Sequence, residues 1–284
     1  MRPTGGDAMH GSATADLPGV IVIGHGTADA TGAEETRRTA ALVADLLPGA
    51  AVELGFLELA TPSIDDAVAR LAVRGCRAVV AAPLLLFRAG HARRDVPEAL
   101  AAAAARHGLA VRQAEPLGCH PAIVALARRR REAVAQGQDA VAAVGTRLVV
   151  LGRGSSDPRA VCQLCRLALA TSAGVPAAMP LHLGFAAAAR PTLDEALAEA
   201  CAAAGVRRII VQPHLLFAGH VEGQVDAAVA HGRARRPDIE WLRAARLGAD
   251  PAVAAALVGR ALEVAPELRN AVSLAANETS PRLP

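Results

Sequence analysis

One apolar segment occurs twice in this 284-residue chain, and the repetition constrains the fold more than any other feature. The first copy runs over residues 79–91 and the second over residues 209–220. Each copy passes a proline and then a phenylalanine, and ends in Gly-His. Apolar runs of this length are typical of buried strands. Because open α/β sheets bind ligands just past the carboxyl ends of their strands, the two copies predict two parallel sheets, each with a histidine near its ligand-binding edge.

The rest of the chain repeats in the same order. Gly-His-Gly-Thr at residues 24–27 corresponds to Gly-Arg-Gly-Ser at residues 152–155. Corresponding positions lie 128 or 129 residues apart in three pairs: His25 and Arg153, Pro62 and Pro191, His91 and His220. Ordered signals at one fixed spacing indicate an internal duplication.

Within each copy, short β-branched runs alternate with helical patterns, which is typical of a parallel sheet covered by helices on both faces. In the first copy, a helix from Pro121 completes the unit. We therefore expect an α/β protein with two similar domains, residues 18–137 and 146–266, each a parallel β-sheet flanked by helices. We expect the polar ends, residues 1–17 and 267–284, to be disordered.

The composition excludes several classes of function. All 30 basic residues are arginine, so the chain has neither a P-loop lysine nor an amine for a Schiff base. Aromatic residues make up 2% of the chain, which leaves little to stack on bases, and we expect no nucleic-acid partner. The sequence shows neither an apolar run of membrane-spanning length nor a signal peptide. We expect a cytoplasmic protein with no membrane partner.

The five cysteines form an odd set without an extracellular context, so we expect reduced thiols. Cys162 and Cys165 have the spacing of a redox or metal motif. They lie inside a helical apolar pattern, without a second cysteine pair or a nearby histidine. We interpret them as helix-packing residues.

Three polar residues follow consecutive apolar segments of the first copy: His25, Glu58 and His91. Because strand ends along one edge of a parallel sheet converge, we expect the two imidazoles and the carboxylate to meet in one cleft. That donor set suits a transition metal such as cobalt or iron. The second copy has Arg153 and Ala187 at the first two positions. We therefore expect one main site in the first copy, to which the second copy contributes a wall, a cation at Arg153 or a vestigial site.

The second copy also gains an imidazole. His214 stands where the first copy has Leu84, and His220 keeps the position of His91. The two histidines either form a second metal-holding point or are loop residues that face the cleft between the domains. The residues by themselves leave both readings open.

Three ordered motifs of the first copy resemble the sirohydrochlorin chelatases of the cobalamin and siroheme pathways. They are Gly-His-Gly-Thr at 24–27, Phe-Leu-Glu-Leu-Ala-Thr-Pro-Ser-Ile at 56–64, and Pro-Leu-Leu-Leu-Phe-Arg-Ala-Gly-His at 83–91. In the second copy, the motif at 152–158 resembles the C-terminal repeat of the family's long, two-domain form. The likeness extends from Val20 to about Pro251.

The resemblance implies ATP-independent insertion of Co²⁺ or Fe²⁺ into sirohydrochlorin, a carboxylate-rich tetrapyrrole. It implies that His25 and His91 are metal ligands that also accept the pyrrole protons, and that Glu58 assists them. A neutral imidazole can both hold a metal loosely and take a proton near neutral pH. The metal ion is then a substrate, and we expect no permanently bound cofactor.

Arginines near these motifs are candidates for binding the carboxylates of such a substrate. They are Arg88, Arg93, Arg94 and, in the second copy, Arg153. For the three near His91, the alternative is a solvated helix start. The duplication further suggests that the two domains imitate, within one chain, the dimer of a single-repeat relative, so we expect a monomer.

Three other functions share part of this pattern. A metal or tetrapyrrole delivery protein would use the same ligands, and the sequence leaves that alternative open. A histidine phosphatase is expected to carry Arg directly before its nucleophilic His, where this chain has Gly24. A dinucleotide-binding oxidoreductase needs a third glycine at the position of Asp29. The choice between cobalt and iron is not encoded in a His/His/Glu set.

Overall fold

The computed structural model describes residues 17–87, 91–135, 144–173 and 179–272, without the side chains of residues 91–93. The predicted disorder of residues 1–17 and 267–284 falls largely outside these ranges. A 3-10 helix, Pro266–Ala271, overlaps the start of the second of these ends. Leu268 and Ala271 of this helix are buried.

Strands and helices alternate along both halves of the described chain. The first half contains β1 (Gly19–Gly24), α1 (Ala30–Leu46), β2 (Val52–Phe56), α2 (Ile64–Val73), β3 (Ala78–Pro83), α3 (His91–His107), β4 (Ala110–Gln113) and α4 (Pro121–Ala135). The second half contains β5 (Thr146–Gly152), α5 (Pro158–Ser172), β6 (Leu181–Phe185), α6 (Leu193–Ala202), β7 (Arg208–Pro213), α7 (His220–Arg235), β8 (Glu240–Arg243) and α8 (Pro251–Val264).

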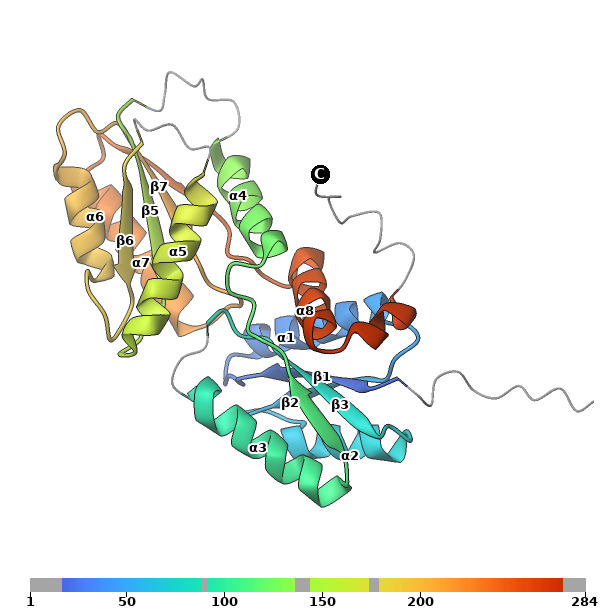
Figure 1. Cartoon of the computed structure of the whole chain (residues 1–284). Coiled ribbons are helices and arrows are strands. Elements are labelled where there is room, and N and C mark those ends of the chain that lie inside the picture. Colours follow the sequence, from blue (N-terminus) through green and yellow to red (C-terminus); the bar gives the residue numbers. More distant parts are fainter. Residues whose placement is uncertain (1–16, 88–90, 136–143, 174–178, 273–284) are drawn as a thin grey trace, which may run out of the picture.

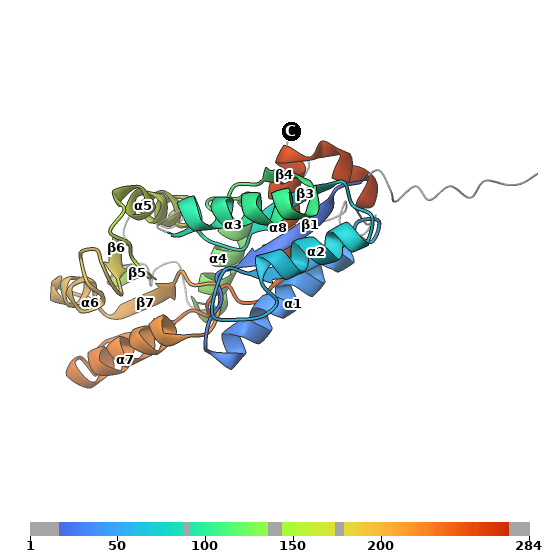
Figure 2. The same ribbon diagram turned by 90° about the horizontal axis from the view of Figure 1, so that it is seen from below.

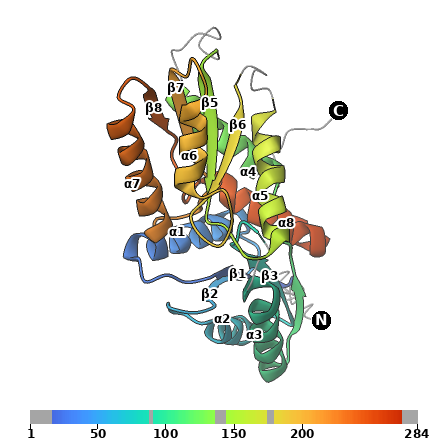
Figure 3. The same ribbon diagram turned by 90° about the vertical axis from the view of Figure 1, so that its left-hand side faces the viewer.

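The strands form two parallel four-stranded sheets of the same topology. The strand order is β2-β1-β3-β4 in the first sheet and β6-β5-β7-β8 in the second. The registers also correspond, since Gly24 pairs with Phe56 and Gly152 pairs with Phe185. The second sheet stands above the first, and α1 and α8 cross the middle of the molecule (Figure 3). The predicted α/β architecture, with two similar sheets flanked by helices, is confirmed.

Two layers of apolar side chains cover the first sheet, because successive residues of a strand point to opposite faces. Ile21 and Ile23 of β1 pack with α2 and α3 on the outer face. These two helices lie side by side below the sheet (Figures 1 and 2). Val20 and Val22 point to the inner face and pack with α1 and α8. All of β1 is therefore buried, as a central parallel strand requires.

The helices on the inner faces are exchanged between the halves. α8, from the end of the chain, packs against α1 and β3 of the first half. α4 leaves the first half and packs against α5 and β7 of the second, where Gln212 Nε2 donates a hydrogen bond to the carbonyl of Ala127 at 2.7 Å. The sequence order predicts that α4 completes the first unit; the structure instead places it over the second sheet.

The exchange joins both inner faces into one hydrophobic core. This core contains Val20 and Val22 of the first sheet together with Leu148 and Val150 of the second. The two halves therefore share their main apolar interior. The domain boundaries 18–137 and 146–266 stay a prediction.

The structure also bears on the predictions about the cysteines and about membrane-spanning segments. All five cysteines are free thiols. Cys162 and Cys165 lie on α5, as predicted, but Cys162 is exposed, so only Cys165 is placed to pack. Among the described helices, none combines the length and apolar content needed to cross a membrane.

Candidate functional site

The carboxyl ends of β1, β3, β5 and β7 meet at one cavity between the halves, with a volume of about 520 Å³. The loops after these strands line it: residues 24–27 and 84–87 from the first half, and residues 152–156 and 214–218 from the second. Most of the lining is apolar side chains and glycine. This is the edge at which open α/β sheets bind ligands.

His25 and Glu58 lie together at this edge. His25 follows β1 and lines the cavity, and its Nδ1 lies 3.4 Å from Oε1 of Glu58, which follows β2. The backbone holds the two loops together, because the N–H of Glu58 donates to the carbonyl of His25 at 3.0 Å. The side chains are 30% and 49% exposed. A ligand in the cavity can therefore reach an imidazole that is already oriented by a carboxylate.

The loop after β1 approaches the loop of Glu58 so closely that it requires a glycine. Gly26 has φ +99°, and a Cβ there would lie 1.7 Å from the carbonyl oxygen of Glu58. Gly154 repeats the arrangement at φ +84°, with a Cβ position 1.9 Å from the carbonyl oxygen of Ala187. Such backbone conformations and contacts favour glycine alone. The second half thus keeps the backbone of the site after losing its imidazole and carboxylate.

The loop that carries Glu58 is closed at its far end by the start of α2. Ser63 and Asp66 form a capping box, in which each side chain accepts the backbone N–H of the other residue. The hydrogen bonds from Ser63 lower the pKa of the Asp66 carboxyl. The N–H of Phe56 donates to the carbonyl of Pro62 at 2.8 Å. The second half repeats both features, with Thr192 and Glu195 as the capping box.

The third predicted ligand, His91, is the first residue of α3, and its side chain lies outside the described part of the chain. Arg88 and the side chain of Arg93 lie outside it as well. Arg94 is described and is exposed on the first turn of α3. Among the described residues, no group of three or more His, Cys, Asp or Glu is close enough to hold a metal ion. A metal site that includes His91 therefore stays a prediction.

Arg153 stands at the end of β5, where His25 stands in the first half. Its side chain is exposed and lines the cavity. Within the described ranges it has no carboxylate partner at ion-pair distance. Its charge is thus available to an anionic group of a ligand.

The two histidines of the second half lie in different surroundings. His214 lines the cavity and is only 4% exposed, and its Nε2 has no hydrogen-bond partner in the described part of the chain. Its ring centroid lies 5.7 Å from that of Phe87 in the first half. Burial lowers the pKa of His214 to about 3, so its imidazole is neutral. His220, the first residue of α7, is exposed and is not part of the cavity lining.

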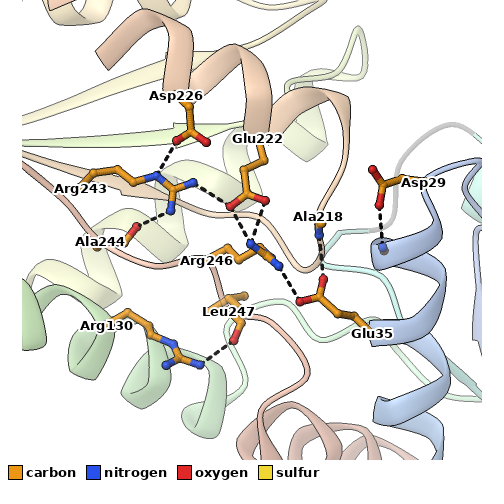
Figure 4. Close-up of polar contacts among 11 residues, drawn as sticks. Asp29, Glu35, Arg130, Ala218, Glu222, Asp226, Arg243, Ala244, Arg246 and Leu247 are labelled. Atoms are coloured by element: carbon orange, nitrogen blue, oxygen red, sulfur yellow. Dashed lines mark hydrogen bonds and ion pairs between the residues drawn. The ribbon is translucent and has the colours of Figure 1, made fainter. Parts of the chain in front are cut away.

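An ionic network fixes one wall of the cavity (Figure 4). Glu35 of α1 accepts a hydrogen bond from the N–H of Ala218 at 2.8 Å and another from Nη2 of Arg246 at 2.6 Å. Arg246 also donates to both carboxylate oxygens of Glu222, at 2.7 and 2.8 Å. Ala218 ends the loop that lines the cavity from the second half. The network therefore ties that loop to the first half.

Sequence reasoning missed this network, since Glu35 and Arg246 are 211 positions apart. Comparing the two copies gives one signal. Glu35 corresponds to Gln163, 128 positions later. Arg246 corresponds to Pro116, because each directly precedes a Leu-Gly pair, so charges stand in one copy only. A charged residue whose counterpart in the other copy is uncharged indicates a contact that the duplication did not produce twice.

Known proteins match this chain along most of its length. A family model, CbiX, matches residues 19–134 and again residues 147–264. The sirohydrochlorin cobaltochelatase of Priestia megaterium is 25% identical over 248 residues, which span 87% of this chain and 80% of that protein. The sirohydrochlorin ferrochelatase of Bacillus subtilis is 28% identical over 214 residues, which span 75% and 78%.

A solved structure supports the fold. The structure of SirB from Bacillus subtilis with Fe³⁺ matches with a TM-score of 0.75 and 24% identity, over 90% of this chain and 99% of that one. The double match of the family model agrees with the duplication seen in the sequence and in the two sheets.

Proposed function

The chain belongs to the CbiX family, and from this premise we propose that it inserts a divalent metal ion, Co²⁺ or Fe²⁺, into sirohydrochlorin without ATP. The relatives that insert cobalt and iron support both ions as substrates. The observation that carries the proposal is the pair of His25 and Glu58, 3.4 Å apart at the edge of a cavity large enough for a small-molecule ligand.

In the proposed reaction, two pyrrole N–H bonds break and the metal ion binds the ring nitrogens. His25 takes a proton from the ring, because a neutral imidazole accepts protons near neutral pH. Glu58 holds the imidazole in place and stabilises the positive charge that forms on it. His91 is proposed as the second imidazole, which shares the ion with His25 before insertion and takes the second pyrrole proton.

The carboxylates of the substrate need cations at the rim of the cavity. We assign this role to Arg153, which lines the cavity without a carboxylate partner among the described residues. Arg94, Arg88 and Arg93 are proposed for the same role on the first half. A guanidinium suits a carboxylate, since it donates two parallel hydrogen bonds.

The proposal also covers the oligomeric state and the compartment of the protein. One core shared by both halves, with helices exchanged between them, supports a monomer that carries its own pseudo-dimer. Five free cysteines fit a reducing compartment and support a place in the cytoplasm.

The test follows the absorbance of sirohydrochlorin with the purified protein and Co²⁺ or Fe²⁺. We expect conversion above the uncatalysed rate, and a loss of about 100-fold or more in His25→Ala and Glu58→Gln, as for loss of a proton-transfer group. His231→Ala is the matched control, because His231 is an exposed histidine that does not line the cavity. Tetrapyrrole binding without any acceleration would refute the enzyme and favour a delivery protein.

A further inference from the structure

His214 is a buried polar group that the proposed reaction does not use. Among the described residues its Nε2 has no hydrogen-bond partner, and the residue is 4% exposed. A buried polar group without a partner is costly to the folded state, and native proteins contain few of them. The residue lines the cavity, so a ligand that fills the cavity lies next to this imidazole.

The fold itself does not require an imidazole at this position. In the first half the same position is Leu84, which is also buried. The N–H of Leu84 donates to the carbonyl of Ile23 at 2.8 Å, and the N–H of His214 donates to that of Leu151 at 2.7 Å. The two backbones are equivalent, so leucine satisfies the structure. The imidazole is an addition specific to the cavity wall of the second half.

The surroundings of His214 favour a neutral partner. Phe87 lies against its ring, and Leu215 and Leu216 follow it along the cavity wall. A carboxylate placed against these apolar side chains would lose its hydration, which is unfavourable. A pyrrole N–H is a neutral donor, and a neutral imidazole has a ring nitrogen that accepts a hydrogen bond. Burial keeps the imidazole neutral by lowering its pKa to about 3.

We propose that His214 accepts a hydrogen bond from a pyrrole N–H of the metal-free macrocycle and so makes the cavity prefer substrate over metallated product. This inference rests on the proposed function. His25 lines the cavity from the first half and His214 lines it from the second, so a ring bound there contacts both halves. Metal insertion removes the pyrrole protons, so the hydrogen bond exists with the substrate and is absent with the product. Losing this hydrogen bond on metal insertion favours release of the product.

The test measures Kd for metal-free sirohydrochlorin and for its cobalt complex, in the wild type and in His214→Leu, together with Tm of the free protein. Leucine reproduces the residue of the first half. We expect a three- to tenfold weaker Kd for the metal-free ring, the loss typical of one neutral hydrogen bond. The Kd of the cobalt complex stays unchanged, and Tm is unchanged or higher. His214→Gln, which retains an acceptor, recovers part of the affinity. His231→Leu, the same substitution at an exposed histidine outside the cavity lining, alters neither Kd.

Three results overturn the inference. Equal weakening of both complexes assigns His214 to cavity shape, and unchanged affinity for both assigns it no role in binding. A fall of several degrees in Tm for His214→Leu makes the imidazole structural. If the wild type binds neither form of the tetrapyrrole, the proposed function fails and not only this inference.

Discussion

Replacing Glu35 with glutamine is expected to destabilise the protein by about 2 kcal/mol. The side chains of Glu35 and Arg246 are 20% and 23% exposed, and their hydrogen bond is 2.6 Å long. A hydrogen bond to a charged group contributes about 1.5–3 kcal/mol. Glutamine keeps an acceptor for the N–H of Ala218 but removes the charge that faces Arg246. Arg246 keeps Glu222 as a partner, which limits the loss.

The assay is urea unfolding of the four proteins of a double-mutant cycle: wild type, Glu35→Gln, Arg246→Gln and the double variant. We expect a coupling energy of about 1–2 kcal/mol, since the two residues are in direct contact. Glu34→Gln is the matched control on the same helix. Its partner Arg37 lies 3.6 Å away, and the two side chains are 74% and 47% exposed. An exposed pair of this kind contributes about 0–1 kcal/mol.

The hydrogen bond between Glu35 and the N–H of Ala218 links this network to ligand binding. Because Glu35 holds the end of the cavity loop, Glu35→Gln also weakens tetrapyrrole binding, whereas Glu34→Gln does not. A coupling energy near zero, with the two glutamine variants equally stable, would refute the reasoning. Packing and backbone hydrogen bonds would then hold the loop without the network.

Three further predictions concern pH, the site backbone and cooperativity. Because burial lowers the pKa of His214 from 6.5 to about 3, only the unfolded state takes up the proton between these values. The free energy of unfolding therefore falls as the pH drops below 6.5, and His214→Leu should show a shallower fall; equal slopes in acid titrations of stability contradict this. Gly26→Ala should lower Tm far more than Gly75→Ala, since both glycines have positive φ but nothing lies within 4 Å of a Cβ at Gly75; similar shifts would exclude the clash with Glu58. Trp241, the single tryptophan, is buried in the second half. Its fluorescence should report the same urea midpoint as far-UV circular dichroism, because one core joins the halves, and two separate midpoints would argue against that core.

Much of the candidate site follows from the sequence. The approach of His25 and Glu58 was predictable, because each follows a strand of one parallel sheet. The equivalence of the two copies was predictable from the spacing, and it extends to the glycines at 26 and 154. The burial of His214 was not, since a histidine within an apolar loop segment reads equally well as exposed or buried. Only the packing of Phe87 and the opposite half decides it.

The same division holds for the fold. Local hydrophobic periodicity determined the strands, the helices and their order, because period and length distinguish the two kinds of element within a short window. It did not determine which sheet each helix covers. Apolar burial is non-directional and depends on area, and both inner faces offer equivalent apolar surfaces to α4 and α8.

The helix exchange is decided by contacts between distant parts of the chain. Gln212 donates to the carbonyl of Ala127, and Nη1 of Arg112 donates to the carbonyl of Val264 at 3.0 Å. Such bonds exist only once both helices are docked, so no local pattern encodes them. The sequence by itself determined two copies of one sheet and the residues at their edges. The tertiary structure decided that the copies share helices and a core, and thereby enclose one cavity between them.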